Sequence, residues 1–446
     1  MKRRFQKIAA LMLVGAMAGT LVTGCGGSSS GSSSESSSDS KEASDSSSSN
    51  SNGAAEVTLW HYFEHEAPDL EAVAEKYNES QDKIHVTCTY VSREELMNQY
   101  TIGAVSGELP DIGMVDSPDM ESYISLGVFE DITDDIKDWD ELDQFYDGPL
   151  SSCMDADGKY YGLPNNSNCL TLCCNMDILN AAGIENPPTT WEELDAACAK
   201  LKEAGITPIT ADDAYLTSFI GYHFARYIGQ DGVKSLVTGE EYNGESVTWD
   251  DEKVKAAAES FADFAKKGYF SKNIATNKYP AGQNQEFAPG DAAIVICGSW
   301  LPNEAKDSVA DDLEWGYFNY PSVPDGKDDN TANNIANQVL AINKDSKMAD
   351  KAFQLIEYIT TGEYDKKMTE DALCIPTDKA NSDAWPTELA EVKAGFDATT
   401  TYYDWAAGAE SNNDLTGTLK TSALELAAGK LDAAGFISAM KKAAGK

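Results

Sequence analysis

The stretch VTLWHYFEHEAPDLEAVAEKYNESQDKIHVTCTYVSREELMNQYTIGAVSGELPDIGMV, residues 57–115, decides the fold of this chain. It opens with a β-type run at 57–60, and strand-like runs recur at 84–91 and 111–115. Pro68 stands where the first turn of a helix tolerates proline. The residues after it place one apolar face at i, i+3, i+4 and i+7, made of Leu70, Val73, Ala74 and Tyr77. Strand–helix–strand–helix–strand within this length predicts a parallel sheet with crossover helices.

The same alternation returns further along the chain. Runs at 160–164, 170–174, 292–297 and 338–342 are typical of strands. Thr190 and Glu193 have the spacing of a capping box at the start of another helix. The chain beyond its N-terminal segment has roughly 390 residues, which is too many for one typical domain. We therefore expect an α/β protein built from two domains.

The N-terminal residues follow the order of a bacterial export signal. A basic start is followed by a mostly apolar run over 8–22, which is too short for a permanent membrane span. Val22-Thr23-Gly24-Cys25 resembles a lipobox, in which cleavage leaves Cys25 to carry acyl chains. We expect a signal peptide over 1–25 and lipidation at Cys25, which holds the protein outside the cytoplasm on the cell membrane. An ordinary signal peptide with a chance cysteine is the alternative.

A serine-rich segment follows, and its composition predicts a disordered tether over 26–55. The net charge of the chain is −40, and the acidity increases further once the basic signal peptide is removed. This charge excludes nucleic acid as a partner, because nucleic-acid binding depends on Lys and Arg neutralising phosphates. It also disfavours an anionic ligand. Eight cysteines besides Cys25 lack metal-site spacing, so we expect most to be buried free thiols.

Candidate binding residues are the ones that follow predicted strands, because open α/β sheets bind ligands beyond the carboxyl ends of their strands. Aromatic and acidic side chains gather there. They are Trp60, His61 and Glu64 after the first strand, Asp116 after the third, Trp300 after a later buried strand, and Tyr402 and Trp405 near the C-terminus. Aromatic faces stack on the apolar face of a sugar ring, while carboxylates accept hydrogen bonds from its hydroxyls. This combination predicts a carbohydrate site.

Catalytic alternatives have weaker support. His61-Tyr62-Phe63-Glu64-His65 matches a zinc-peptidase pattern, but that chemistry needs both histidines on one helix, and here they precede it. No Walker A motif is present, because Asp328 follows Gly326-Lys327 where Ser or Thr is required. Carboxylates are too abundant to indicate a glycosidase. We expect no catalysis, no cofactor and no metal.

The chain resembles the family 1 extracellular solute-binding proteins of ABC sugar importers, the family of maltose-binding protein. Each matching segment is short, and their order and spacing together carry the resemblance. The segments are Val57 to His61, Gly107 to Ile112, Tyr161 to Pro164, Asn175 to Asp177, Pro188 to Leu194, Phe287 to Ala293, Gly298 to Trp300 and Ala427 to Lys430.

The resemblance implies a two-lobe periplasmic-binding-protein-like fold of type II. Each lobe would have a mostly parallel sheet flanked by helices, and crossing hinge strands would join the lobes, near 161–168 and again near 317–323. The expected lobes are 56–163 with 325–375, and 164–324 with 376–446. By motif position the resemblance implies that five residues line the cleft: Glu64, Asp116, Asn168, Trp300 and Trp405.

The implied function is capture of a carbohydrate, expected to be an oligosaccharide, by hinge closure. A lipid-anchored monomer would then deliver the sugar to the transmembrane subunits of an ABC permease. Two alternatives stay open at this point. One is a binder of another solute, such as a polyamine, peptide or metal, and the other is an exported enzyme such as a glycosidase.

Overall fold

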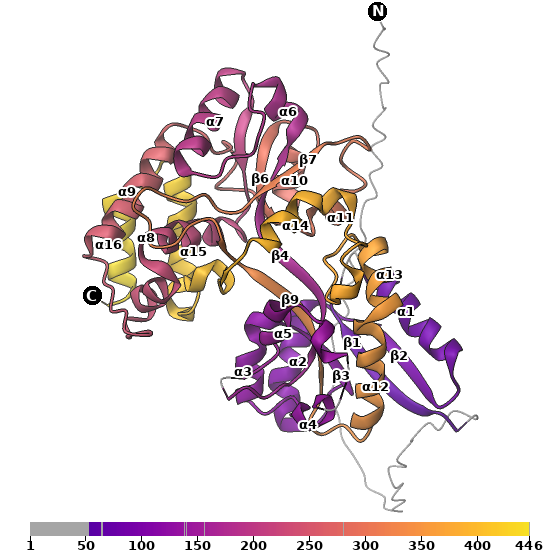
Figure 1. The fold of residues 1–446 in the computed structure, drawn as a ribbon. Helices are drawn as coiled ribbons and strands as arrows, with labels where there is room; N and C mark the ends of the chain where they lie inside the picture. Colours follow the sequence, from indigo (N-terminus) through magenta and orange to yellow (C-terminus); the bar gives the residue numbers. More distant parts are fainter. Residues whose placement is uncertain are drawn as a thin grey trace, which may run out of the picture. The chain divides into compact units, whose positions relative to one another are not determined.

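The computed structural model describes residues 53–445, except for 64, 65, 138, 140, 156 and 280 (Figure 1). The predicted signal peptide with Cys25, and all of the predicted tether except 53–55, lie outside the described residues. The described residues belong to one folded unit, Ser49–Lys446. Within them, no helix is both long enough and apolar enough to cross a bilayer.

One sheet organises the folded unit, with strand order β2-β1-β3-β9-β4-β6-β5 and with β7 paired to β4. β1 is parallel to β2 and to β3, as the 57–115 stretch predicts. The strand bounds are β1 Ala55–His61, β2 Ile84–Tyr90, β3 Ile112–Asp116, β4 Leu163–Asn175, β5 Thr207–Thr210, β6 Ala292–Gly298, β7 Trp315–Phe318, β8 Ala332–Asn333, β9 Ile335–Ile342 and β10 Thr401–Tyr402.

The sheet is more mixed than expected. β9 runs antiparallel to β3, and β4 runs antiparallel to β6, β7 and β9. β5 and β6 are parallel. The long strands β4 and β9 account for this difference, because each antiparallel pair of the sheet contains one of them. The parallel arrangement that the sequence predicts therefore applies best to β1, β2 and β3.

Two hydrophobic cores divide the folded unit, and they define its two lobes. The first lobe takes its core from residues 57–163 and 339–374, and the second from 169–335 and 375–440. β4 and β9 pair with each other and run from one lobe to the other (Figure 1). The middle of β4 is polar (Asn165 to Asn168) and carries a register shift between Pro164 and Asn166.

The return crossing is later than 317–323, where the resemblance places it. β7 occupies that stretch and pairs with β4 inside the second lobe. Ala332 and Ile335 still belong to the second core, and the first core resumes at Val339. The chain therefore returns along β9, because this strand begins with Ile335 in the second core and continues with Val339 to Ile342 in the first.

Helices flank the sheet, and local sequence explains their ends. α1 buries the predicted face of Leu70, Val73, Ala74 and Tyr77, and Thr190 and Glu193 form the predicted capping box of α7. The bounds are α1 Ala67–Ser80, α2 Arg93–Ser106, α3 Met120–Ser125, α4 Thr133–Ile136, α5 Asp147–Ser151, α6 Met176–Ala181, α7 Trp191–Glu203, α8 Leu216–Thr238, α9 Glu252–Lys266, α10 Ala281–Phe287, α11 Leu301–Ala305, α12 Ala349–Thr360, α13 Gly362–Ala372, α14 Ala390–Asp397, α15 Asn413–Ala427 and α16 Ala433–Ala443. Short 3-10 turns are η1 Ser117–Asp119, η2 Leu142–Gln144, η3 Lys379–Asn381, η4 Thr387–Leu389 and η5 Trp405–Gly408.

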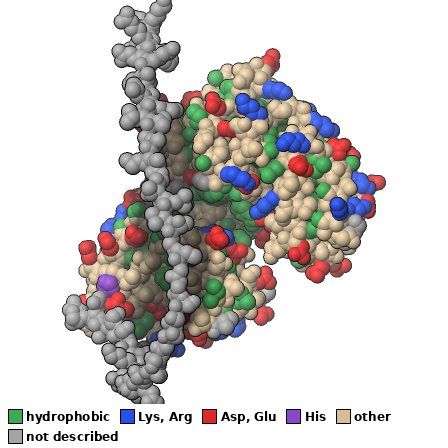
Figure 2. Space-filling model, turned by 180° about the vertical axis from the view of Figure 1, so that it is seen from behind, with side chains coloured by type: hydrophobic (Ala, Val, Ile, Leu, Met, Phe, Trp, Pro, Cys, Tyr) green, Lys and Arg blue, Asp and Glu red, His purple; other side chains and the backbone are tan. Residues whose placement is uncertain are grey.

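The cysteines of the described part of the chain are free thiols. All are buried except the half-buried Cys88, which confirms the prediction of buried free thiols. Burial raises the pKa of the Cys153 thiol to about 12, so this thiol stays protonated at neutral pH. On the surface, acidic and basic side chains are interspersed over the face that Figure 2 presents.

Candidate functional site

An aromatic group gathers in the second lobe around Tyr215, which stands just before α8. The ring centroid of Trp300 is 5.6 Å from that of Tyr215, and the ring centroid of Trp405 is 5.8 Å from it. Tyr279 meets Tyr215 edge to face at 5.2 Å. Two of the residues predicted for sugar stacking, Trp300 and Trp405, are therefore brought onto one tyrosine. We call these four residues the aromatic group.

Trp300 owes its position to the end of β6. An added Cβ at Gly298 would lie 1.9 Å from Cζ3 of Trp300, so the indole ring lies directly on the glycine backbone. Ser299 fixes the strand exit, because its backbone N–H donates to the Cys169 carbonyl and its Oγ accepts from the Cys169 N–H. The indole Nε1 of Trp300 is buried and has no hydrogen-bond partner among the described residues. The ring is thus held in place with one donor unused.

Tyr215 owes its position to the end of β5, the parallel neighbour of β6. Asp212 follows this strand and is fully buried, and its Oδ1 accepts the backbone N–H groups of Ala214 and Tyr215. Its Oδ2 has no partner among the described residues. Burial raises the pKa of Asp212 to about 6, against the opposing effect of these two hydrogen bonds. The carboxyl ends of β5 and β6 therefore supply Tyr215, Trp300 and a buried acid.

Glu304 of α11 lies at the edge of the aromatic group. It accepts a 2.7 Å hydrogen bond from the hydroxyl of Tyr279 and another from the amide of Asn284. Lysines nearby are occupied, since Lys278 pairs with Asp213 and Lys234 pairs with Asp404. The polar surroundings of the aromatic group are therefore rich in acceptors.

A group of polar side chains in the first lobe is centred on Asp116 at the end of β3. We call Asp116, Tyr62, Arg93 and Gln338 the Asp116 group. Its Oδ1 accepts from the hydroxyl of Tyr62 at 2.6 Å and from the amide of Gln338 at 3.2 Å. Its Oδ2 accepts from Arg93 Nε at 2.7 Å. Burial, and then the charge of Asp116, raise the pKa of Tyr62 well above its ordinary value, so its hydroxyl remains a donor. Asp116 thus stands in the polar position that the strand-end rule predicts.

The Asp116 group reaches the strands that join the lobes. Gln338 lies on β9, and its Oε1 accepts from the amide of Asn168 on β4 at 3.4 Å. Arg93 also pairs with Asp119, so both ends of its guanidinium are occupied by carboxylates. Asn168 is therefore connected to Asp116 through Gln338. Arg93, the cation of the Asp116 group, already pairs with two carboxylates and is not free to attract an anion.

The structure corrects the predictions at the end of the first strand. Trp60 and His61 lie within β1, not in the loop that follows it, because β1 pairs with β2 through Tyr90. His61 is fully buried against Phe63 and Tyr90, and neither ring nitrogen has a partner among the described residues. Burial lowers its pKa to about 4. His61 thus presents no surface to a solute here.

The same geometry overturns the zinc-peptidase pattern. That pattern needs its first histidine on a helix, whereas His61 is a strand residue packed in the core. Glu64, predicted both from the strand-end rule and from the resemblance, lies outside the described residues. Among the described residues, no group of three His, Cys, Asp or Glu side chains is placed to hold a metal ion.

Tyr402 and Trp405 take different positions although they are close in sequence. Trp405 joins the aromatic group, whereas Tyr402 on β10 is exposed and lies against α5 of the first lobe. A Cβ on Gly148 would come within 2.7 Å of the Tyr402 ring. The structure therefore does not bring Tyr402 to the aromatic group.

Sequence reasoning missed Tyr215, Tyr279 and Gln338, and it placed Tyr62 after the first strand without assigning it to the solute. Residues 207–210 form β5, and recognising that short strand would have pointed to Asp212 and Tyr215 by the strand-end rule. Gln338 is the half-buried polar residue of an otherwise buried strand, which is a usable signal. Tyr279 lies in a loop, and no pattern in the sequence distinguishes it.

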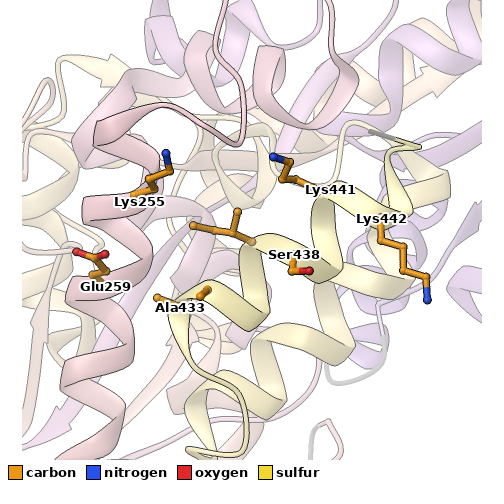
Figure 3. Close-up of a pocket in the computed structure, with 8 residues that line it drawn as sticks. Lys255, Glu259, Ala433, Ser438, Lys441 and Lys442 are labelled. Carbon is orange, nitrogen blue, oxygen red and sulfur yellow. The ribbon is translucent and has the colours of Figure 1, made fainter.

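A surface depression of about 630 Å³ lies elsewhere, between α9 and α16 (Figure 3). Its lining includes Lys255, Glu259, Ser438, Lys441 and Lys442. None of these belongs to the aromatic group or to the Asp116 group. Lys441 pairs with Asp250, and the lining has no aromatic side chain, so we do not assign the solute to this depression.

Comparisons with known proteins agree with this geometry. A family model described as bacterial extracellular solute-binding protein matches residues 72–394. The sn-glycerol-3-phosphate-binding periplasmic protein of Agrobacterium fabrum is 25% identical over 257 residues, which cover 54% of this chain and 56% of that protein.

Two solved structures are similar to this chain over nearly all of their own length. The GacH receptor of Streptomyces glaucescens, solved unliganded and with acarbose, has a TM-score of 0.69 at 19% identity and covers 88% of this chain and 97% of its own. A chitin oligosaccharide binding protein has a TM-score of 0.71 at 22% identity and covers 87% of this chain and 98% of its own. These likenesses confirm the predicted α/β periplasmic-binding-protein fold.

Proposed function

The chain belongs to the bacterial extracellular solute-binding proteins, and from this premise we propose that it is the carbohydrate-binding subunit of an ABC importer. Proteins of this family bind solutes for ABC transport outside the cytoplasm and are not catalysts. The exported glycosidase considered as an alternative is therefore set aside. What remains to be decided is the class of solute.

The aromatic group carries the proposal of a carbohydrate. The ring centroids of Trp300 and Trp405 each lie within 6 Å of that of Tyr215. Tyr215 and Trp300 follow the neighbouring strands β5 and β6, and Trp405 joins them from η5. Ring faces shield the apolar C–H face of a pyranose, and each buried aromatic side chain contributes a large contact area. Glu304, Asp116 and the amides near them supply the acceptors that sugar hydroxyls need.

Electrostatics favour a neutral solute over a phosphorylated one. Arg93 is paired with Asp116 and Asp119, and the lysines beside the aromatic group are paired with Asp213 and Asp404. A phosphate would have to break one of these pairs to gain a cation. Glycerol phosphate, which the Agrobacterium relative is named for binding, is therefore the second candidate and not the first.

The mode of capture follows from where the two groups lie. We place the solute between the aromatic group of the second lobe and the Asp116 group of the first, with Asn168 and Gln338 on the crossing strands. A solute that contacts both lobes stabilises the closed form by its extra contacts there. The residues we assign to the solute are Asp116, Asn168, Trp300 and Trp405, with Trp60 and Glu64 retained from the sequence.

The N-terminal segment sets the location that we propose. Lipidation at Cys25 would anchor the mature protein to the cell membrane, and the serine-rich residues after it would give the lobes reach toward a permease. We further propose a monomer whose partners are the solute, the membrane and the transmembrane subunits of the importer. Cells grown with labelled fatty acid should incorporate the label into the wild-type protein and not into Cys25→Ala, and an unlabelled wild-type protein would refute the anchor.

A thermal-shift screen tests the solute class. The probes are neutral oligosaccharides of several linkages, sn-glycerol 3-phosphate, polyamines and divalent metals. A ligand at 100 times its Kd stabilises the folded state by about 2.7 kcal/mol, which is readily seen as a shift in Tm. We expect a shift with a neutral oligosaccharide that disappears in Trp300→Ala. A shift with glycerol phosphate or a polyamine alone would overturn the carbohydrate assignment.

A further inference from the structure

The segment 402–408, which supplies Trp405, carries unusual backbone strain. Ala406 and Ala407 have φ values of 51° and 50°, although neither is glycine, and both are fully buried. A left-handed conformation costs an ordinary residue energy and persists only where the surrounding structure enforces it. Two such residues in succession, directly after Trp405, show that this segment is held by its neighbours and not by its own preference.

Helix α8 provides one of the restraints. Gly221 lies so close to the segment that a Cβ there would be 2.0 Å from the Ala406 carbonyl oxygen. Further along α8, Gln230 accepts the backbone N–H of Asp404, and Lys234 pairs with the Asp404 carboxylate. The segment is therefore pressed against α8 on both sides of Trp405.

The strongest restraint comes from Arg226 in the middle of α8. This arginine is fully buried, and its four hydrogen bonds go to the carbonyl oxygens of Tyr320, Pro321 and Ala332 and to the hydroxyl of Tyr403. Burying a charge without a directly paired counter-charge is costly. The nearest compensation passes through Tyr403, whose hydroxyl donates to Asp328 at 2.6 Å.

Tyr403 links this arginine to Trp405. Its hydroxyl lies 3.0 Å from Nη1 of Arg226, and its ring centroid lies 5.4 Å from the guanidinium carbon. Its backbone is fixed as well, because its N–H donates to the Asn333 carbonyl and its own carbonyl accepts from Asn334. Every polar atom of Tyr403 is thus bonded two residues before the indole.

We propose that Arg226 is a positioning residue for solute binding, which acts through Tyr403 to hold the strained 402–408 segment and so presents Trp405 in its binding orientation. The inference rests on the proposed function, in which Trp405 contacts the solute. Holding the ring in place before the solute arrives removes an ordering cost from binding. The strain in Ala406 and Ala407 is the energetic cost of that arrangement.

Relieving the strain separates this role from a merely structural one. In Ala406→Gly/Ala407→Gly the left-handed backbone becomes unstrained, so we expect the Tm to stay equal or rise, while the segment gains freedom and the Kd rises at least threefold. Asp325→Gly is the matched control, because it also replaces a left-handed residue, on an exposed loop, and should leave the Kd unchanged. A fall in Tm together with an unchanged Kd would overturn the proposal.

Removing the Tyr403 hydroxyl tests whether Arg226 acts through Tyr403. Tyr403→Phe keeps the ring and loses the hydroxyl, and we expect the Kd to rise at least fivefold. The same change in a Trp405→Phe background should cost nothing further, because the effect acts through Trp405. Tyr320→Phe is the control, since Tyr320 is equally buried beside Arg226 but its hydroxyl bonds to His223. An equal loss in the Trp405→Phe background would refute the coupling.

An assay without solute keeps this inference distinct from the proposed function. The acrylamide quenching of Trp405, taken as the difference between each protein and its Trp405→Phe partner, should increase in Tyr403→Phe and not in Tyr320→Phe. If no carbohydrate binds the wild-type protein, the proposed function fails while this assay still decides the positioning. Unchanged quenching in Tyr403→Phe would refute it.

Discussion

Gly298→Ala, which adds a single methyl group, should displace the Trp300 ring and weaken solute binding without unfolding the protein. Gly298 is the last residue of β6 and is buried, and its φ is not in the left-handed region, so alanine fits the backbone. The new Cβ would lie 1.9 Å from Cζ3 and 2.1 Å from Cη2 of Trp300. Ordinary carbon contacts begin near 3.4 Å, so the indole must withdraw by roughly 1.5 Å.

The size of the effect follows from where the ring can go. Trp300 is half-buried, so its ring has room to swing outward, and we expect an unfolding free energy lower by no more than about 1 kcal/mol, at the small end of overpacking costs. A ring displaced by more than an ångström no longer stacks on a sugar held by Tyr215 and Trp405. We expect at least a tenfold rise in Kd, equivalent to about 1.4 kcal/mol.

Isothermal titration with the best carbohydrate from the screen measures this change, and thermal unfolding measures the stability. Gly417→Ala is the matched control, because a Cβ there meets open space in α15. It should leave the Kd unchanged. Trp300→Ala and the double variant complete a cycle, in which Gly298→Ala should cost nothing further once the indole is absent. Wild-type affinity in Gly298→Ala, or a loss that persists without the indole, would refute the reasoning.

Three further outcomes are expected. Asp212→Asn should raise the unfolding free energy at pH 7 by about 1–3 kcal/mol, because the folded-state pKa of about 6 lies above the ordinary 3.8 and the ionised acid is disfavoured in the fold. The difference in unfolding free energy between the two proteins should shrink as the pH falls from 6 to 4. Denaturant unfolding at several pH values measures this difference, and a value independent of pH would contradict the expectation. Tyr62→Phe removes the 2.6 Å hydrogen bond to Asp116 and should raise the Kd severalfold with little change in Tm; calorimetry showing unchanged affinity would count against the Asp116 group. Asn303→Ala removes the 2.6 Å hydrogen bond from α11 to the Ala372 carbonyl and leaves that carbonyl without this donor. The free energy of unfolding in urea should fall by about 1–3 kcal/mol, and an unchanged midpoint would contradict this expectation.

The architecture was predictable where local patterns repeat. Periodic apolar residues placed α1 and the parallel strands β1, β2 and β3, because burial of one helical face and of a central strand dictates which positions must be apolar. The return crossing was misplaced, because β7 and β9 are both apolar strands and nothing local tells which of them leaves a lobe. That choice depends on which core each strand completes.

The site was predictable only in part, for a similar reason. The strand-end rule placed Asp116 and Trp300 at the ends of β3 and β6, where the structure has them, and their contact with a solute stays a prediction. It misjudged His61, which β1 carries into the core one residue beyond the predicted strand. It could not find Tyr279, a loop residue that meets Tyr215 from far along the chain.

The sequence by itself determined an acidic α/β protein of two domains, with an export signal, buried thiols and aromatic residues at strand ends, because these features follow from composition, chain length and the local periodicity of apolar residues. Only the tertiary structure decided that Tyr215 gathers Trp300 and Trp405, that Arg93 is already neutralised, and that Arg226 reaches Tyr403. These are contacts between residues far apart in the chain. Their existence depends on how the packed lobes bring separate segments together, which no local pattern encodes.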